Sequence, residues 1–301
     1  MSRKLTIAYS DSYLDWKLGA FHPTNPIRAK IATEWLDGPG TDIVSPVLDT
    51  DRLVKLLSEV HDRSYIDAVL AGRSDEWSGA RPDLGRTAAL MAQGTVDLVD
   101  QMLVDREADE RTGVYFNPQG AKHHAMRDRS GGFCVFNDMA VAGKTLLDQG
   151  LSVVYVDWDA HHGDGVEELL RDTDAWTFSI HDGSIFPGTG LENDAENRAY
   201  NWPLEPGSGD AELLDAVHEV CGLVDNVEPD VIMMAIGADG LEEDPLSTTR
   251  YSIKGYADAA KEVRSLADRH GSTLLVGGAG GYTPWTSTPL TWATVVRELA
   301  D

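Results

Sequence analysis

The chain has 301 residues, of which 42% are hydrophobic, so it is long and apolar enough to bury a large core. Asp and Glu number 50 against 25 Lys and Arg, which gives a formal net charge of −25 at pH 7. Direct binding of nucleic acid is therefore not expected, because it requires a clustered basic surface. No apolar run in the sequence approaches membrane-spanning length, so a membrane partner is not expected either.

The cysteines and the acidic excess bear on the surroundings of the protein. Cys134 and Cys221 form neither a disulfide framework nor a metal-type pair. This fits a reducing compartment, and we expect a cytoplasmic protein. The acidic excess is typical of a soluble protein in a salty cytoplasm, but it would also attract cationic substrates such as lysine-rich peptides or polyamines. Composition does not separate these two interpretations.

Short β-branched runs alternate with longer amphipathic segments along the whole chain. The short runs predict strands, and the segments with apolar residues at helical spacing predict helices. In chain order, strands are expected within residues 4–10, 113–117, 152–159, 175–181, 230–238 and 272–281, and helices at 84–104, 138–149, 210–224, 254–268 and 289–299.

This alternation predicts βαβ units and an α/β fold. We expect a three-layer α/β/α arrangement with a central, mostly parallel sheet of about eight strands. No internal repeat or linker is visible, so the prediction is a single domain over residues 1–301. Ligands of such sheets bind outside the carboxyl ends of the strands, so polar clusters directly after the strands indicate a site.

The stretch YVDWDAHHGDG, residues 155–165, is one such cluster. In an extended segment Asp159 and His161 point to the same side, where they can offer one oxygen and one nitrogen to a metal ion. Asp239 follows another predicted strand in an equivalent position. Two Asp and one His suit zinc or ferrous iron and leave a position open for water and substrate. A lone Asp-x-His pair is also typical of a hydrogen-bonded loop anchor, so this pattern alone leaves both interpretations open.

The distribution of histidines favours the metal interpretation. His123 and His124 are adjacent in a Gly-rich loop before a predicted helix. Five of the nine histidines, at positions 123, 124, 161, 162 and 181, are expected in three strand-end loops. Histidines without a shared role would be scattered along the chain.

Six motifs follow one another from residue 22 to residue 285: HPTNPIRAKI, HHAMRDRSGGFCVFND, VVYVDWDAHHGDGVEELL, SIHDGSIFPGTG, GADGLEEDPLSTTRYS and GGAGGYTPW. With these motifs the chain resembles the zinc-dependent deacetylase superfamily of histone deacetylases, acetoin-utilisation proteins and acetylpolyamine amidohydrolases, which shares its fold with arginase. Several motifs in family order are a more specific signal than any one of them.

The resemblance implies a metal-dependent amidohydrolase with an assigned metal site. Its metal ligands are Asp159, His161 and Asp239, with zinc as the cofactor and ferrous iron as the alternative in vivo. Two carboxylates cancel the formal charge of zinc, so this metal should acidify water less than a three-histidine site does. A nearby general base is therefore needed.

The resemblance also implies the residues that supply acid-base chemistry. His123 and His124 are expected beside the reacting water, with Asp157 orienting His123 and Asp164 orienting His124. His124 is the expected base and the later proton donor to the leaving amine, and His123 is mainly electrostatic. Tyr282, which follows the last predicted strand, matches the tyrosine whose hydroxyl stabilises the oxyanion.

Two further sites follow from the resemblance. A narrow apolar tunnel is expected to receive the acetylated amine, with Gly132, Phe133, Phe186, Gly280 and Gly281 as its substrate-binding positions. A structural monovalent-cation site for potassium is expected beneath the metal ligands, at Asp157, Asp159, His161, Ser179 and Ile180.

The chain departs from the family pattern at two places. Lys122 stands where a small or apolar residue is commoner, which puts the tunnel floor or the product exit in question. Residues 71–83 occupy the place of a rim loop whose acidic residue grips the substrate backbone, and either Asp75 or Glu76 could fill that role.

The predicted function is hydrolysis of an acetyl amide by metal-activated water. Its substrates are acetyl-lysine side chains of proteins or peptides, or acetylated amines such as acetylpolyamines. A non-catalytic acetyl-lysine-binding protein is the alternative from another class. An arginase-like ureohydrolase is less favoured, because Gly163 stands where a further Asp would be needed for a second metal.

Overall fold

The computed structural model describes residues 3–20, 22–108 and 112–301. Its central sheet contains eight strands, all paired in parallel, in the order β2-β1-β3-β8-β7-β4-β5-β6. The strands are β1 (Leu5–Ala8), β2 (Thr41–Val44), β3 (Val114–Asn117), β4 (Val153–Asp157), β5 (Trp176–Asp182), β6 (Ala199–Leu204), β7 (Val231–Ala235) and β8 (Thr273–Gly277).

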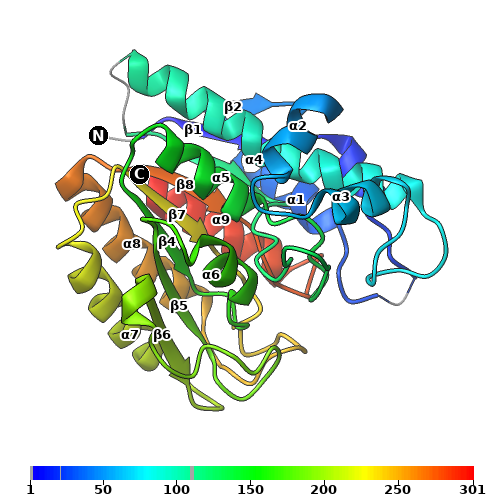
Figure 1. The fold of residues 1–301 in the computed structure, drawn as a ribbon. Helices are drawn as coiled ribbons and strands as arrows, with labels where there is room; N and C mark the ends of the chain where they lie inside the picture. The colour runs from blue at the N-terminus through cyan, green and yellow to red at the C-terminus, as the bar shows by residue number, and fades with distance from the viewer. Residues whose placement is uncertain (1–2, 21, 109–111) are drawn as a thin grey trace.

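Helices cover both faces of this sheet (Figure 1). One layer holds α2 (Thr50–Leu57), α3 (Arg63–Leu70), α4 (Pro82–Glu107), α5 (Asp138–Asp148) and α6 (Asp164–Leu170). The other layer holds α1 (Ile27–Leu36), α7 (Asp210–Val224), α8 (Ile253–His270) and α9 (Ser287–Ala300). Two single-turn 3₁₀ helices, η1 (Asp11–Asp15) and η2 (Ala195–Asn197), lie in connecting segments.

The central strands are apolar on both sides because both faces of the sheet are covered. In β4, Val153 and Tyr155 join the core beneath α4 and α5, whereas Val154 and Val156 join the core beneath α7 and α8. The alternation of side chains along a strand produces this division. The predicted α/β class and three-layer architecture are confirmed, and the sheet is wholly parallel in the described part of the chain.

The sheet topology brings five loops to one edge. Strands β3, β8, β7, β4 and β5 are consecutive neighbours in the sheet, and parallel pairing places all their carboxyl ends on the same side. The loops that follow them are distant in sequence but share this edge, where ligands of open α/β sheets bind.

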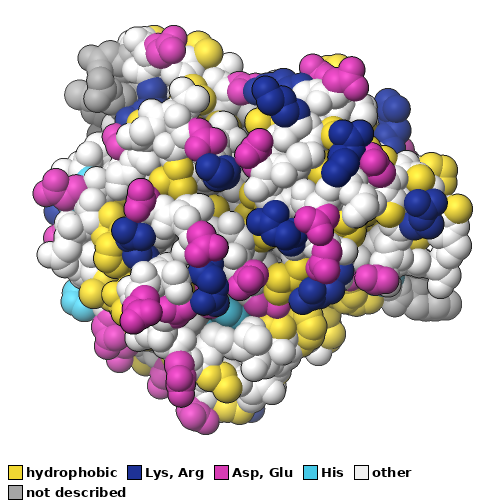
Figure 2. Space-filling model, in the orientation of Figure 1, with side chains coloured by type: hydrophobic (Ala, Val, Ile, Leu, Met, Phe, Trp, Pro, Cys, Tyr) yellow, Lys and Arg dark blue, Asp and Glu magenta, His cyan; other side chains and the backbone are white. Residues whose placement is uncertain are grey.

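The charged surface and the length of the helices can be described separately. On the face shown in Figure 2, Lys and Arg side chains are interspersed with acidic ones and do not gather into one patch. None of the helices in the described residues is long and apolar enough to cross a membrane.

Candidate active site

Asp159, His161 and Asp239 lie together at the carboxyl edge of the sheet. Nδ1 of His161 is 3.1 Å from Oδ1 of Asp159 and 3.0 Å from Oδ2 of Asp239. One potential ligand atom from each residue lies within 4.8 Å of the others, and all three side chains are buried. The strand β4 ends at Asp157, so Asp159 and His161 lie in the following turn and not in the extended run predicted for them.

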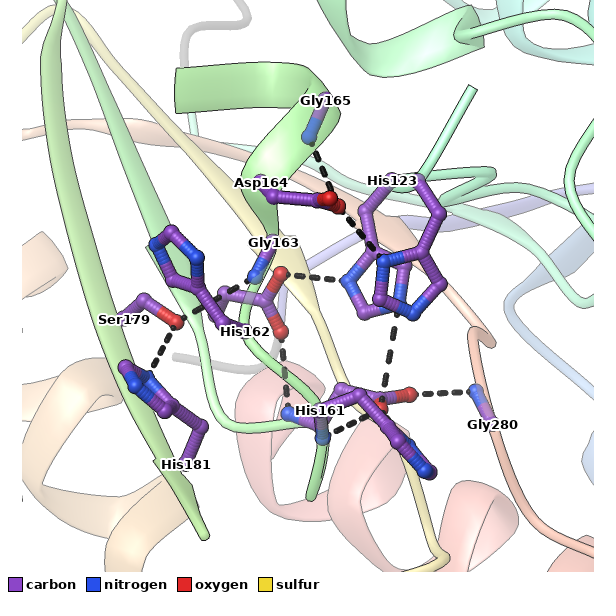
Figure 3. Close-up of polar contacts among 12 residues, drawn as sticks. His123, His161, His162, Gly163, Asp164, Gly165, Ser179, His181 and Gly280 are labelled. Carbon is purple, nitrogen blue, oxygen red and sulfur yellow. Dashed lines mark hydrogen bonds and ion pairs between the residues drawn. The ribbon is translucent and has the colours of Figure 1, made fainter. Parts of the chain in front are cut away.

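Backbone groups hold the two carboxylates in place. The N–H of Gly280 donates to Oδ2 of Asp159 at 2.6 Å, a contact visible in Figure 3. The N–H of Ala160 donates to Oδ1 of Asp239 at 3.0 Å. The loops after β4, β7 and β8 are thereby joined at this cluster.

The three side chains fit a divalent cation. Two carboxylates buried beside each other repel, and a positive ion between them relieves that repulsion. Their oxygens and the imidazole nitrogen converge on one point and form an O₂N donor set, which suits zinc or ferrous iron. The residues predicted as metal ligands are therefore brought together in a geometry that can hold such an ion.

Two histidine–aspartate pairs flank this cluster. Nδ1 of His123 is 2.7 Å from Oδ2 of Asp157, and Nδ1 of His124 is 2.7 Å from Oδ1 of Asp164. Asp164 also accepts from the N–H of Gly165 at the start of α6, and Figure 3 shows this contact. A carboxylate bound at one ring nitrogen fixes the tautomer and orients the other nitrogen. The pairs predicted from the resemblance are present as contacts.

The two imidazoles have opposite electrostatic environments. Their rings lie 4.0 Å apart, so protonation of one opposes protonation of the other. Burial opposes the charge on His123, but the carboxylates of Asp157 and Asp159 outweigh it and raise the pKa of His123 to about 9. Burial and the neighbouring charge of His123 lower the pKa of His124 to about 4. Of the two rings, His124 is the one available to accept a proton.

Three more histidines were expected in strand-end loops: His161, His162 and His181. His161 and His124 are near each other, with ring centroids 6.0 Å apart. His162 instead lies near His181, with ring centroids 4.7 Å apart and the rings tilted by 45°, and it contacts Thr189. His181 lies within β5, so its prediction as a strand-end loop residue was wrong.

An apolar cavity leads to the cluster. It has a volume of about 390 Å³ and is lined by His124, Gly132, Phe133, His161, Ile185, Phe186, Leu246 and Tyr282. The Phe133 and Tyr282 ring centroids are 5.9 Å apart. Gly132 has φ +54°, and a Cβ atom there would lie 2.3 Å from Cδ2 of His124, so the close approach requires glycine.

Gly280 and Gly281 contribute mainly through their backbones. Gly280 binds Asp159, as described above, and Gly281 accepts from Nη1 of Arg28 through its carbonyl oxygen. Neither glycine lines the 390 Å³ cavity. Gly280 instead lines a smaller internal cavity beside it.

The residues predicted for the monovalent cation lie close together. Asp157 and Ser179 are register partners in the β4–β5 pair. The Ser179 hydroxyl lies 3.0 Å from Nδ1 of His181, and a dashed line marks this contact in Figure 3. The Ile180 side chain is buried in the core beneath α7 and α8. The cation site itself remains a prediction.

The two rim acids are placed differently. Oε2 of Glu76 accepts from the backbone N–H of Phe133 at 3.1 Å, and the side chain is half-buried. Asp75 is exposed, and its N–H donates to the Ser130 hydroxyl. Glu76 thus supports the wall of the cavity, whereas the carboxylate of Asp75 faces solvent.

Sequence reasoning missed three residues that support the site. His61 bridges both ends of the histidine loop, because its ring nitrogens contact Met126 O at 2.7 Å and the N–H of Asn137 at 2.9 Å. Asp244 accepts from the N–H of Tyr282, and the buried Arg28 binds Gly281. Asp244 and Arg28 lie within quoted motifs, but no local pattern marks the contact that either one makes.

The chain matches one protein family over nearly its whole length. The model of the Histone deacetylase domain matches residues 22–299. Acetoin utilization protein AcuC of Bacillus subtilis (strain 168) is 32% identical, over 99% of this chain and 82% of the relative. AcuC of Staphylococcus aureus (strain COL) is 30% identical, over 100% of this chain and 82% of the relative. The crystal structure of the HDA15 HD domain aligns with a TM-score of 0.83 at 25% identity, covering 98% of this chain and 88% of that one.

The fold, the match and these relatives define the class of protein. It is a deacetylase, a hydrolase that acts on amide bonds. The chain belongs to the histone deacetylase family. The predicted family and enzyme class are confirmed.

Proposed function

We propose that the protein is a zinc-dependent amidohydrolase that removes acetyl groups from acetyl-lysine side chains or from acetylated amines such as acetylpolyamines. The convergence of Asp159, His161 and Asp239 beside two histidine–aspartate pairs, at the inner end of an apolar cavity, carries this proposal. Ferrous iron is the alternative metal, and potassium is the proposed ion of the monovalent site. We also propose that residues 1–301 act as one catalytic domain in the cytoplasm, without nucleic acid or membrane partners.

The proposed metal site uses the side chains of Asp159, His161 and Asp239. Bound there, zinc would supply Lewis-acid chemistry, which polarises an amide carbonyl and makes water more acidic. The negative charge of the two carboxylates limits that acidification, so a protein base is required.

His124 is the proposed general base. Asp164 fixes its Nδ1, so its Nε2 is free to accept a proton from water and to donate one to the leaving amine. His123 has a mainly electrostatic role in this proposal: Asp157 binds its Nδ1 and favours its protonated form. The negative charge that develops on the substrate carbonyl oxygen is thereby stabilised on one side.

Tyr282 is the proposed donor to that oxyanion. It lines the same cavity as His124, and two contacts hold its backbone: its own N–H donates to Asp244, and Arg28 donates to the carbonyl of the preceding Gly281. Burial and the charge of Asp239 raise the pKa of Tyr282, so its hydroxyl stays protonated and can donate. A fixed donor of this kind lowers the barrier without reorganisation during the reaction.

Acetate release from a substrate panel tests this function. The protein is stripped with a chelator, reloaded with zinc or ferrous iron, and assayed with acetyl-lysine peptides and acetylpolyamines beside the variants Tyr282→Phe and His124→Ala. We expect metal-dependent turnover that falls about 100-fold or more in both variants. Tyr200→Phe on the edge strand β6 is the matched control, since that ring stacks near Trp176 and Phe178 away from the site. Metal binding without turnover of any substrate would contradict the proposal.

A further inference from the structure

Two positively charged side chains are buried at the inner end of the site. Lys122 is 9% exposed and Arg28 is 3% exposed. Both line a small internal cavity of about 20 Å³, together with Cys134. This cavity shares Gly132, Phe133 and Tyr282 with the 390 Å³ cavity, so it adjoins the end at which an acyl group would sit.

Neither cation has an acidic partner in the part of the chain that the structure describes. No hydrogen bond or ion pair joins Nζ of Lys122 to another described residue. Arg28 donates to the carbonyl of Gly281, but its buried Nε has no partner among the described residues. The guanidinium otherwise lies over the rings of Trp292, at 4.8 Å, and Tyr282, at 5.9 Å.

The nearest acidic groups are engaged elsewhere. Asp138 accepts from the backbone N–H groups of Ala121 and Lys122 and from the Thr95 hydroxyl. Asp159 belongs to the proposed metal site. Burial raises the pKa of the Cys134 thiol, so this thiol stays neutral and supplies no negative charge.

Both cations therefore have no ion-pair partner among the described residues, and carboxylates favour their charge only from beyond hydrogen-bond distance: Asp239, Asp159 and Asp244 for Arg28, and Asp138 and Asp159 for Lys122. Burial lowers the pKa of Lys122 to about 8, which leaves it mostly protonated at neutral pH. The charge of Arg28 opposes that of Lys122, so the two repel each other in a region with little water. Isolated buried charges are strongly unfavourable unless an opposite charge accompanies them. The pair thus has the character of a site for an anion.

The position of the 20 Å³ cavity indicates how an anion would reach Lys122 and Arg28. His123, Gly280 and Tyr282, which surround the proposed reaction centre, also line it. An anion attached to the acyl group of the substrate would enter it directly. The small cavity alone holds about one water molecule, so an attached carboxylate would occupy it together with the adjoining end of the 390 Å³ cavity and must lie close to the carbonyl.

We propose that Lys122 and Arg28 bind the terminal carboxylate of a short dicarboxylic acyl group, so that the enzyme hydrolyses malonyl-type amides of lysine or amines. Malonyl is the shortest such group and adds a single carboxylate to the acetyl methyl carbon. This inference rests on the proposed amidohydrolase function and extends its substrate class.

The reaction needs no reagent beyond water. The oxygen of water forms a bond to the amide carbonyl carbon, and the bond between that carbon and nitrogen breaks. The leaving nitrogen takes up the protons released by the water. A malonyl amide with one negative charge yields malonate with two and an ammonium group with one positive charge, so atoms and charge balance.

The test compares three acyl groups on one lysine peptide: acetyl, malonyl and isovaleryl. Isovaleryl resembles malonyl in shape but has a neutral branched end in place of the carboxylate. We expect the metal-loaded enzyme to hydrolyse malonyl-lysine with at least 10-fold higher kcat/KM than isovaleryl-lysine, as a charge-assisted contact predicts. This comparison uses only the wild-type enzyme, so its result does not depend on whether a variant folds.

The variant Lys122→Met then tests whether Lys122 binds the malonyl carboxylate. It should lower the ratio of kcat/KM for malonyl over acetyl substrate by about 10- to 100-fold. Lys254→Met is the matched control, because Lys254 is an exposed lysine on α8 and its loss should leave that ratio unchanged. The unfolding midpoint of Lys122→Met should not fall, because the substitution removes a buried charge that has no ion-pair partner among the described residues.

The other outcomes separate the two proposals. Turnover of acetyl-lysine without malonyl-lysine would overturn the malonyl inference and leave the deacetylase function intact. No turnover of any acyl peptide with either metal would overturn the function itself. Free acetate could be the anion instead: inhibition by acetate that Lys122→Met relieves, without malonyl turnover, would assign the cavity to the released product and overturn the acyl assignment.

Discussion

The backbone N–H of Tyr282 donates a hydrogen bond of 2.7 Å to Oδ2 of Asp244, which lies 38 residues earlier in the chain. Oδ1 of the same buried carboxylate accepts from the N–H of Leu246, a residue that lines the apolar cavity. Asp244 thus joins the tyrosine loop after β8 to the cavity wall that follows β7. It touches no reacting atom, so we assign it as a positioning residue for Tyr282.

Substitution of Asp244 tests this positioning. Asp244→Ala removes both acceptors and should lower kcat for acetyl-lysine hydrolysis about 10-fold or more, with little change in KM, because the tyrosine acts mainly in the transition state. Asp244→Asn retains one acceptor oxygen and should recover much of the loss. Steady-state kinetics on both variants measures the difference. Equal activity of the alanine variant and the wild type would exclude the role.

The pair of His124 and Asp164 makes a second prediction. Asp164→Asn keeps the size of the side chain but removes the charge that fixes Nδ1 of His124. We expect kcat/KM to fall about 10- to 100-fold, the usual cost of losing a carboxylate that orients a histidine beside a metal site. Glu168→Gln is the control, because it removes an exposed carboxylate from the same helix, α6. A similar loss in both variants would indicate a general effect on α6 and contradict the specific one.

The sequence predicted the buried strands well but not the edge strands. β4, β7 and β8 are apolar on both faces, which produces a clear signal. β2 is an edge strand with exposed side chains, and the edge strand β6 contains Pro203, so neither shows the usual pattern. The expected number of about eight strands was right, but the positions of β2 and β6 in the sequence were not identified.

The predicted site followed from motifs, whereas its supports did not. Asp159, His161 and the histidine pairs lie in short runs with distinctive spacing, so they could be named before the fold was known. His61, by contrast, is a single residue between α2 and α3, and its contacts to Met126 and Asn137 span 65 and 76 residues. Only the folded chain creates such contacts, so no local pattern could indicate them.

The two acids of the rim loop, Asp75 and Glu76, differ in whether they are free to grip a substrate backbone. The carboxylate of Glu76 is bound to the N–H of Phe133, whereas Asp75 is exposed. We therefore expect Asp75→Ala to raise KM for acetyl-lysine peptides several-fold without changing kcat, since a surface contact to the substrate backbone contributes about 1 kcal/mol. Glu76→Ala should lower kcat instead, because it frees the loop that carries Phe133. Kinetics on a peptide and on a small acetylated amine distinguishes the two, since only the peptide has a backbone to grip.

His61 makes the stability of the fold depend on pH. Burial lowers its pKa from 6.5 to about 4, and both ring nitrogens are hydrogen-bonded in the neutral form. Between these two values the unfolded chain binds a proton that the folded protein does not, so the free energy of unfolding decreases as pH falls from about 6.5 towards 4. From pH 7 to pH 5 this group should remove about 2 kcal/mol.

The measurement compares wild type with His61→Gln, which keeps an acceptor for the N–H of Asn137 but does not titrate. Urea unfolding of both proteins at pH 7 and pH 5, in the presence of a chelator, gives the difference in pH dependence. Carboxylates elsewhere titrate equally in both proteins, so their contributions cancel when the two pH dependences are subtracted. The variant should be less stable at pH 7, where it lacks the contact between Nδ1 and Met126 O, and should lose about 2 kcal/mol less than the wild type on acidification. The same slope in both proteins would show that His61 does not contribute to the pH dependence.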